Sequence, residues 1–417
     1  MIRTIRRTLT QIGKIITVGS SILVGVSFAL SATFNYSFQI MSGRYLGSEK
    51  YGLLAGLLSV MSITTVGLSA FQIQVAKAIA TGQTEFPPKF VDRQFVNATR
   101  AACFGTLFLM SMAPFASHFW DVGILPIIFV CVYFLPAAWD SIAAGRFQGG
   151  KNFTGLARYN LAQSVMKISS LLVVIILGLG VTSIIGLITM SAAAVSLMGL
   201  NRTQFLGTTN NPGFDIETRR ILGTNILLWM MVSIDVIIAH RALGSDAGNY
   251  AAASTISKAL LWTPALAIQV LFPHLSSRNL MAGGMISLIR KGALATVIIA
   301  VSSAILLSLV GPIMVKSLYG DSFDGAGQDL WKLCLAFIPF SVSQFLISVH
   351  FVNGHVHLMR VMLVLAVLEG AALFLFGTDI SSFSLIIGVM GVTLSLALVL
   401  FGENAKAFSI QTKLKGR

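Results

Sequence analysis

Arg44-Tyr45-Leu46-Gly47-Ser48-Glu49 is repeated 197 residues later as Arg241-Ala242-Leu243-Gly244-Ser245-Asp246. At the same offset, Ala70-Phe71-Gln72-Ile73 returns as Ala267-Ile268-Gln269-Val270. Two matches at one offset indicate that the chain is a tandem duplication of one ancestral half. In an apolar chain, duplicated halves are typical of transporters that build two lobes around a central cavity.

The composition places the chain in a lipid bilayer. Hydrophobic residues make up 55% and charged residues 11% of the 417 residues, whereas soluble domains carry about 25% charged residues. A helix needs about 20 apolar residues to cross the hydrocarbon core. Apolar stretches of this length fall at residues 16–41, 52–76, 101–118, 122–144, 159–179, 181–200, 221–239, 251–272, 292–315, 330–350, 358–377 and 382–402. The predicted fold is all-α and integral to the membrane, with twelve transmembrane helices in two parallel-repeat six-helix bundles.

The net charge of +14 is explained by orientation in the membrane. Most of the 29 Lys and Arg residues fall in segments on one side of the predicted spans, and that side is cytoplasmic by the positive-inside rule. The cations at or beyond the outer ends are Arg44, Lys50, Arg241, Lys316 and Lys332. Both termini are therefore expected in the cytoplasm, and the chain in the inner (plasma) membrane of a bacterium or archaeon. Membrane lipids, and no nucleic acid, are the expected partners.

The two longest interhelical loops are expected at residues 77–100 and 201–220. The predicted division is a six-helix lobe over residues 1–200, a cytoplasmic linker over 201–220 and a second six-helix lobe over 221–417. Neither loop can hold a soluble domain, and the sequence contains no nucleotide-binding loop or catalytic motif, so an enzyme is not expected. His355 and His357 lack a carboxylate or cysteine at ligand spacing, so no metal and no other cofactor is expected.

One face of the fifth predicted span is polar. Asn160, Gln163 and Lys167 recur at i, i+3 and i+7, which places them on one helical face with Lys167 near the membrane midplane. The repeat counterpart of Lys167 is Glu369, at a similar depth in the eleventh span. Two interpretations stay open: a structural Lys–Glu pair between the halves, or a cation for an anionic head group together with a titratable acid.

The second predicted span carries a similar stripe. Ser62, Thr65, Ser69 and Gln72 lie on one face, and Gln269 is the repeat counterpart of Gln72. Small hydroxyl side chains are also common where membrane helices pack. The stripe therefore predicts either helix packing or, through Gln72, contact with a substrate.

Two further acids lie within predicted spans. Asp235 and Lys258 lie at similar depth on either side of a short loop, so a buried ion pair is expected between them. Asp235 then acts either as a structural clamp or as a coupling site for a proton or sodium ion. Asp140 is expected to reach the cytoplasmic interface.

The glycines of the repeated phrase are expected to end a helix in each half. Gly47 and Gly244 follow the last helical residues, where a left-handed conformation is favoured. Arg44 and Arg241 flank these turns at the outer face. They either tie two helices together or form a gate.

These residues carry a resemblance to a known family. Arg44-x-Leu46-Gly47-x-x-x-Tyr51-Gly52, its second copy beginning at Arg241, the preceding Asp235, and Arg146-Phe147-Gln148-Gly149 resemble bacterial polysaccharide-biosynthesis flippases. Their superfamily also contains the multidrug and toxic-compound extrusion (MATE) antiporters. The resemblance covers nearly the whole chain, although the second copy has Gly248-x-Tyr250 in place of Tyr51-Gly52. It implies two six-helix bundles that alternate between inward-open and outward-open states.

The resemblance also implies a substrate, an undecaprenyl-diphosphate-linked oligosaccharide moved from the cytoplasmic to the outer leaflet for cell-surface polysaccharide assembly. A polysaccharide polymerase or glycosyltransferases are the expected protein partners. A diphosphate needs desolvated cations, and Lys167 on its polar stripe is the first candidate. The full set of expected substrate-binding residues is Lys167, Gln163, Asn160, Gln72, Arg44, Lys258 and Arg241.

Two other functions stay open. One is a proton- or sodium-coupled antiporter for drugs or other small molecules, in which Asp235 and Glu369 bind the coupling ion. The other is a non-transporting membrane scaffold or a membrane-embedded glycan-assembly enzyme. The sequence contains no catalytic constellation that would support the glycan-assembly enzyme.

Overall fold

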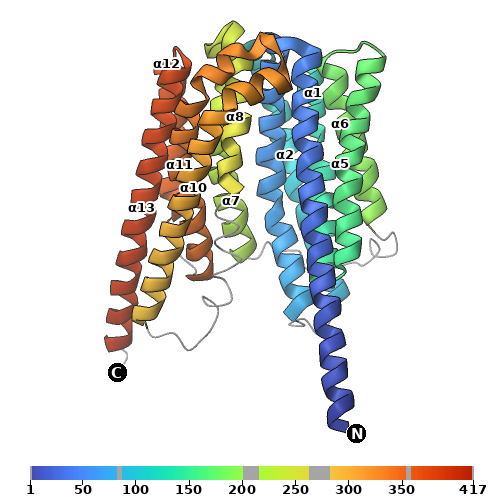
Figure 1. Ribbon diagram of the computed structural model, residues 1–417, viewed down its shortest axis with the longest axis vertical. Coiled ribbons are helices and arrows are strands. Elements are labelled where there is room, and N and C mark those ends of the chain that lie inside the picture. The colour runs from blue at the N-terminus through green and yellow to red at the C-terminus, as the bar shows by residue number, and fades with distance from the viewer. Residues whose placement is uncertain (1, 82–86, 201–215, 263–281, 354–357, 416–417) are drawn as a thin grey trace. The chain divides into compact units, whose positions relative to one another are not determined.

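The computed structural model describes residues 2–81, 87–200, 216–262, 282–353 and 358–415, and side chains over 26–27, 29–80, 91–200, 218–261, 290–347 and 359–400. Regular structure in these ranges is helical, and they contain no strand. The helices are α1 (Ile2–Thr81), α2 (Pro87–Trp120), α3 (Ile124–Val132), α4 (Phe134–Gly149), α5 (Phe153–Ile176), α6 (Val181–Gly199), α7 (Ile216–Ala242), α8 (Ala247–Ser257), α10 (Ala282–Tyr319), α11 (Asp324–Asn353), α12 (Leu358–Phe376) and α13 (Ile380–Lys415) (Figure 1).

Ten helices in the described ranges are long and apolar enough to cross a membrane. Large apolar side chains stay exposed along them: Phe104 is 76% exposed, Leu309 73% and Leu385 69%. Such surfaces are costly in water and favourable against lipid tails. The predictions of an all-α fold and of a multi-pass membrane protein are confirmed.

The chain divides into two compact units. Unit 1 comprises Met1–Tyr45 and Thr64–Leu222, and unit 2 comprises Leu46–Ile63 and Gly223–Arg417. This grouping differs from the predicted lobes at 1–200 and 221–417, because the middle of α1 belongs with unit 2.

Close packing between the two copies of the repeated phrase explains why the middle of α1 belongs to unit 2. Ser48 Oγ donates a hydrogen bond to the Ser245 carbonyl oxygen at 3.4 Å. A Cβ atom at Gly248 would lie 1.9 Å from the Ser48 carbonyl oxygen, so only glycine permits this approach. The second copy has Gly248 at the position that Tyr51 occupies in the first copy. Glycine is required there because the two copies meet at this point.

The predicted helix-ending turns are present. Gly47 has φ +73° inside the long α1 and divides it into two helical parts. Gly244 has φ +55° and opens the short 3-10 turn Gly244–Asp246 between α7 and α8. Both values lie in the left-handed region that glycine adopts without strain, so the expectation from the sequence is confirmed.

The core of unit 1 is built from close helix packing with small side chains. α4 packs against α2 and α6, and α5 lies beside α6 (Figure 1). Val91, Ala98 and Ala102 of α2 are buried in this core. The predicted loop at 77–100 is therefore wrong: α1 extends to Thr81 and α2 begins at Pro87, because the apolar spacing of these residues buries one helical face.

The predicted linker at 201–220 also ends earlier than expected. α7 begins at Ile216, so residues 216–220 are helical and lie outside any loop. Glu217, Arg219 and Arg220 are good helix formers and extend the membrane helix. Residues 201–215 lie outside the described ranges.

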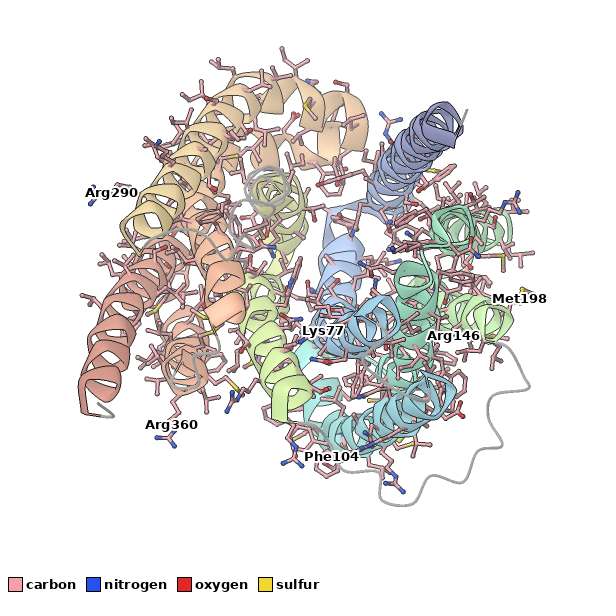
Figure 2. The ribbon with its side chains drawn as sticks, turned by 90° about the horizontal axis from the view of Figure 1, so that it is seen from below. Lys77, Phe104, Arg146, Met198, Arg290 and Arg360 are labelled. Atoms are coloured by element: carbon pink, nitrogen blue, oxygen red, sulfur yellow. The ribbon has the colours of Figure 1, made fainter. Side chains whose placement is uncertain are left out.

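Unit 2 is organised around α11, which packs against α8, α10 and α13. Phe337 and Phe340 of α11 are fully buried. Tyr51, from the part of α1 that belongs to this unit, is also fully buried, and its ring centroid lies 5.7 Å from that of Phe323. At the surface, the exposed Arg290 and Arg360 point away from the helices (Figure 2).

Candidate functional site

Unit 2 contains a buried, fully bonded carboxylate. Asp235 of α7 is 1% exposed, and its Oδ1 lies 2.9 Å from Lys258 Nζ. Its Oδ2 accepts hydrogen bonds from Tyr250 Oη at 2.7 Å and Ser254 Oγ at 2.9 Å. The predicted Asp235–Lys258 ion pair is confirmed.

Helical spacing explains how one carboxylate gathers three donors. Tyr250, Ser254 and Lys258 recur at i, i+4 and i+8 along α8 and the 3-10 turn Lys258–Trp262, so they lie along one face toward α7. Tyr250 and Ser254 are not among the residues predicted for this site. Their spacing from Lys258 is the sequence signal that identifies them.

Unit 2 also contains a buried carboxyl group with no hydrogen-bond partner. Glu369 of α12 is 0% exposed, and neither of its carboxyl oxygens has a hydrogen-bond partner among the described residues. The charges of Asp235 and Lys258 act on it. The next residue, Gly370, packs against Ile234, which places this level of α12 beside Asp235 on α7.

Burial without a partner determines the chemistry of Glu369. An isolated carboxylate away from water is very costly, so such a group either keeps its proton or binds a cation. Lys258 is already paired with Asp235, and the cluster is neutral when Glu369 is protonated. Asp235, Lys258 and Glu369 together can therefore take up and release one positive charge.

Unit 1 contains a cation with a neutral partner. Lys167 of α5 donates a hydrogen bond to Asn35 Oδ1 at 3.0 Å, and its Nζ lies 4.6 Å from the ring centroid of the fully buried Phe38. No carboxylate among the described residues of unit 1 lies within ion-pair distance of this amine. Lys167 therefore has its charge available for an anionic ligand. Asn35 and Phe38 are not among the predicted site residues.

The polar stripe of α5 continues toward α4. Gln163 Nε2 donates hydrogen bonds to Asp140 Oδ1 and, at 3.3 Å, to Tyr159 Oη. Asp140 is half-buried, and these neighbours on α5 offer its carboxylate hydrogen bonds inside the unit. The expectation that it reaches the cytoplasmic interface stays a prediction.

The other predicted binding residues of unit 1 lie close to helix contacts. Asn160 is half-buried on α5, and its carbonyl oxygen accepts a hydrogen bond from Ser164. Gln72 Nε2 donates to Gln148 Oε1 at 3.1 Å, joining α1 to α4. Gln269 and the pair His355 and His357 lie outside the described residues.

The two arginines of the repeated phrase are exposed. Beside Arg44, Tyr45 Oη donates to the Leu179 carbonyl oxygen at 2.9 Å, which joins α1 to the turn before α6. Arg241 lies in the last turn of α7. Their predicted roles in substrate binding stay predictions. Within the described ranges, no group of three or more His, Cys, Asp or Glu residues could hold a metal ion.

Comparisons with known proteins identify related sequences and folds. A family model described as "Polysaccharide biosynthesis protein" matches residues 41–327. No curated protein matches the chain. Among solved structures, the lipid II flippase MurJ in an inward closed conformation is similar with a TM-score of 0.68 and 8% identity, over 92% of this chain and 87% of that chain.

Two transporter structures show the same likeness. A MOP superfamily transporter from Pyrococcus furiosus matches with a TM-score of 0.54 and 10% identity, over 92% of this chain and 94% of that chain. A MATE transporter from Vibrio cholerae matches with a TM-score of 0.58 and 14% identity, over 93% and 97%. At these identities the likeness concerns the fold.

Proposed function

Because the chain belongs to the polysaccharide biosynthesis protein family, we propose that it is a membrane transporter that flips a polyprenyl-diphosphate-linked oligosaccharide from the cytoplasmic to the outer leaflet. It serves cell-surface polysaccharide assembly and works by alternating access. A transporter of this kind needs no catalytic constellation. The observation that carries the proposal is Lys167, a cation inside a membrane helix whose hydrogen-bond partner is a neutral amide.

The chemistry of Lys167 suits a diphosphate. A phosphate oxygen accepts a stronger hydrogen bond from an ammonium group than the Asn35 amide oxygen does, because both partners are then charged. Asn160 and Gln163 on the same face of α5 offer neutral hydrogen bonds to sugar hydroxyls next to the diphosphate. Arg44, Arg241, Lys258 and Gln72 are proposed as secondary contacts.

Flipping in reconstituted vesicles tests the proposal. A polyprenyl-diphosphate oligosaccharide is supplied in one leaflet, and its exposure in the other leaflet is measured with a membrane-impermeant glycosidase. Lys167→Ala is expected to slow exposure at least about tenfold, the value of one charge-assisted hydrogen bond. Lys167→Arg should retain part of the rate, and Lys151→Ala, which removes an exposed cation of the same unit, should retain all of it. Normal flipping by Lys167→Ala would exclude this residue from substrate binding.

The driving force is proposed to be an ion gradient that acts through unit 2. Glu369 binds and releases a proton or sodium ion while Asp235 and Lys258 hold the surrounding charge. This step is supported by the burial of Glu369 without a hydrogen-bond partner. Flipping by wild type should depend on the imposed ion gradient, and flipping by Glu369→Gln should not.

The same site supports a second candidate function, a proton- or sodium-coupled antiporter for drugs or other small molecules. The cluster of Asp235 and Glu369 favours it, as does the likeness of the fold to MATE transporters. The discriminating measurement is dye efflux from vesicles. Efflux by wild type that is lost in Asp235→Asn or Glu369→Gln, together with no flipping of any polyprenyl-linked glycan, would favour the antiporter.

The proposed topology has twelve crossings in two parallel six-helix repeats. α1 supplies two crossings on either side of Gly47, since its apolar part, Ala29–Ala80, has 52 residues. α3 and α4 form one crossing together, and α8 begins another. Both termini then lie in the cytoplasm at the inner membrane. Labelling of single cysteines introduced at residues 3 and 415 with an impermeant reagent tests this orientation.

The proposed partners are a polysaccharide polymerase or glycosyltransferases that make and consume the lipid-linked glycan. A flippase acts between these two steps, so its partners would lie on opposite sides of the membrane. Crosslinking in cells followed by mass spectrometry tests this. Recovery of neither class of enzyme would count against stable association.

A further inference from the structure

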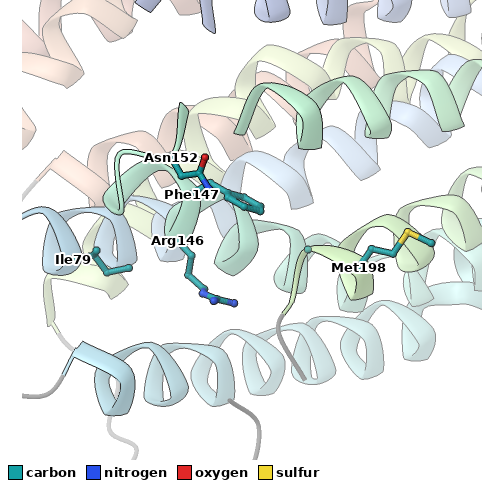
Figure 3. Close-up of a pocket in the computed structure, with 6 residues that line it drawn as sticks. Ile79, Arg146, Phe147, Asn152 and Met198 are labelled. Carbon is teal, nitrogen blue, oxygen red and sulfur yellow. The ribbon is translucent and has the colours of Figure 1, made fainter. Parts of the chain in front are cut away.

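Unit 1 has a cavity of about 460 Å³ at the ends of several of its helices. Its lining comes from the last turns of α1, α4 and α6 and the residue before α5: Ile79, Arg146, Phe147, Asn152, Met198 and Gly199. In Figure 3 the guanidinium of Arg146 extends between the side chains of Ile79 and Met198. By the charge distribution along the sequence, these helix ends face the cytoplasm.

The lining combines one cation with apolar side chains. Arg146 is the one charged residue among the described residues of the lining. Asn152 Oδ1 accepts a hydrogen bond from the Gly155 N–H at 2.9 Å, which leaves the Nδ2 group as a donor. Ile79, Phe147 and Met198 supply the apolar walls. A guanidinium beside an amide donor is suited to two oxygens of one phosphate, and the apolar walls are suited to the carbon atoms attached to it.

The cavity lies at the outer wall of the unit. Met198 is 85% exposed and its α6 neighbours Leu197 and Met190 are 52% and 66% exposed, so this side of α6 faces lipid. Figure 2 shows Met198 at the edge of the unit, with Arg146 further in. Lys167 lies 15 positions after Asn152, roughly 20 Å along α5, so the cavity and the Lys167 site are distinct.

We propose that this cavity binds the phosphate of an anionic phospholipid from the cytoplasmic leaflet, with Arg146 as the phosphate-binding residue. Helix ends at the membrane surface lie at the depth of lipid head groups. A basic pocket between transmembrane helices on the cytoplasmic side is an established kind of phospholipid site. The proposal does not depend on which substrate the transporter moves.

Asp92 of α2 provides an internal control. It interacts electrostatically with Arg146 and therefore competes with a phosphate for the same guanidinium. Removing this carboxylate should tighten lipid binding, whereas removing the guanidinium should weaken it. A purely structural Arg146 would not produce opposite effects in the two variants.

The test measures the apparent Kd of the purified full-length protein in detergent for short-chain phosphatidylglycerol. Arg146→Gln is expected to weaken binding about tenfold, the usual effect of losing one charge-assisted hydrogen bond. Asp92→Asn is expected to tighten binding severalfold. Lys151→Gln, which removes a nearby exposed cation outside the lining, should leave the Kd unchanged.

Three results would overturn the proposal. The first is an unchanged Kd in both Arg146→Gln and Asp92→Asn. The second is equal weakening by Lys151→Gln and Arg146→Gln, which would indicate nonspecific attraction to a basic surface. The third is inorganic phosphate binding as tightly as phosphatidylglycerol, which would assign the cavity to a soluble anion. If Arg146→Gln fails to fold, tighter binding by Asp92→Asn alone supports the proposal and an unchanged Kd overturns it.

Discussion

The two units differ in the partners of the charged side chains within their membrane helices. In unit 1, Lys167 donates to a neutral amide oxygen and lies over an aromatic ring. In unit 2, the equivalent level holds Glu369, while the Lys258 and Asp235 charges pair with each other. The two units carry copies of one short phrase, yet unit 1 has a cation at this level and unit 2 has an acid. Under the proposed function, this difference would give the two units different ligands.

The largest loss of stability is expected from breaking the Asp235–Lys258 ion pair, which distinguishes unit 2. Asp235→Ala leaves Lys258 buried without its counterion, which should destabilise the protein by about 3–5 kcal/mol. Thermal unfolding in detergent measures this change. The double variant Asp235→Ala with Lys258→Met should recover much of the loss, because no unpaired charge is then buried. A double variant no more stable than Asp235→Ala would contradict this account.

A smaller effect is expected from the hydroxyl groups around the same carboxylate. Tyr250→Phe removes one of the donors to Asp235 and nothing else, so we expect a loss of about 1–2 kcal/mol. The matched variant in unit 1 is Tyr133→Phe, whose hydroxyl lies 3.1 Å from Thr65 Oγ1. It should lose less, because this longer bond is to a neutral hydroxyl. Equal losses of stability in the two variants would contradict this expectation.

The turns before the last helix of each unit offer a third contrast. Asp379 accepts a hydrogen bond from the Ser382 N–H ahead of α13, whereas Gly180 before α6 provides no side-chain cap. Asp379→Ala should cost about 1 kcal/mol of stability. The Ser382 hydroxyl and N–H lower the pKa of Asp379.

The contribution of the Asp379 carboxylate should therefore depend on pH in a defined direction. A lowered pKa means that the stabilisation is present above the ordinary Asp range and is lost as the pH falls through the lowered value. Melting curves of wild type and Asp379→Ala should converge on acidification. A difference that widens at low pH would be inconsistent with this cap.

The smallest effects on stability are expected at the two groups that lack an ionic partner. Glu369→Gln replaces the carboxyl group by a neutral amide of the same shape, and Lys167→Met removes a charge that no described carboxylate of unit 1 balances. Each should change the free energy of unfolding by less than about 1 kcal/mol. The pH dependence of transport should flatten in the first variant, and affinity for a diphosphate should fall in the second. Strong destabilisation by either variant would indicate a structural role.

The sequence predicts the local part of this arrangement well. Gly47 and Gly244 could be identified because a helix end and a positive φ are local properties. The Asp235–Lys258 pair could be predicted because a short loop makes two spans neighbours. The helical nature of the chain follows from its apolar stretches.

Contacts between distant segments could not be predicted. The Lys167–Asn35 bond joins residues separated by 132 positions. Packing of α12 beside α7, which brings Glu369 near Asp235, depends on how helices assemble rather than on any local pattern. The hydrogen bond from Gln163 to Asp140 likewise joins two helices, and the sequence of α4 alone does not predict it.

The middle of α1 has a consequence for synthesis of the chain. Leu46–Ile63 leaves the ribosome early, but its packing partner α8 begins only at Ala247. At about 5–20 residues per second, the segment waits roughly 10–40 s for that partner. During this interval the flanking parts of the same helix can already assemble with α2 to α6. Insertion of the first half is therefore expected to produce an intermediate in which the middle of α1 lacks its packing partner. A chaperone or the insertion machinery must then shield this segment until α8 is inserted.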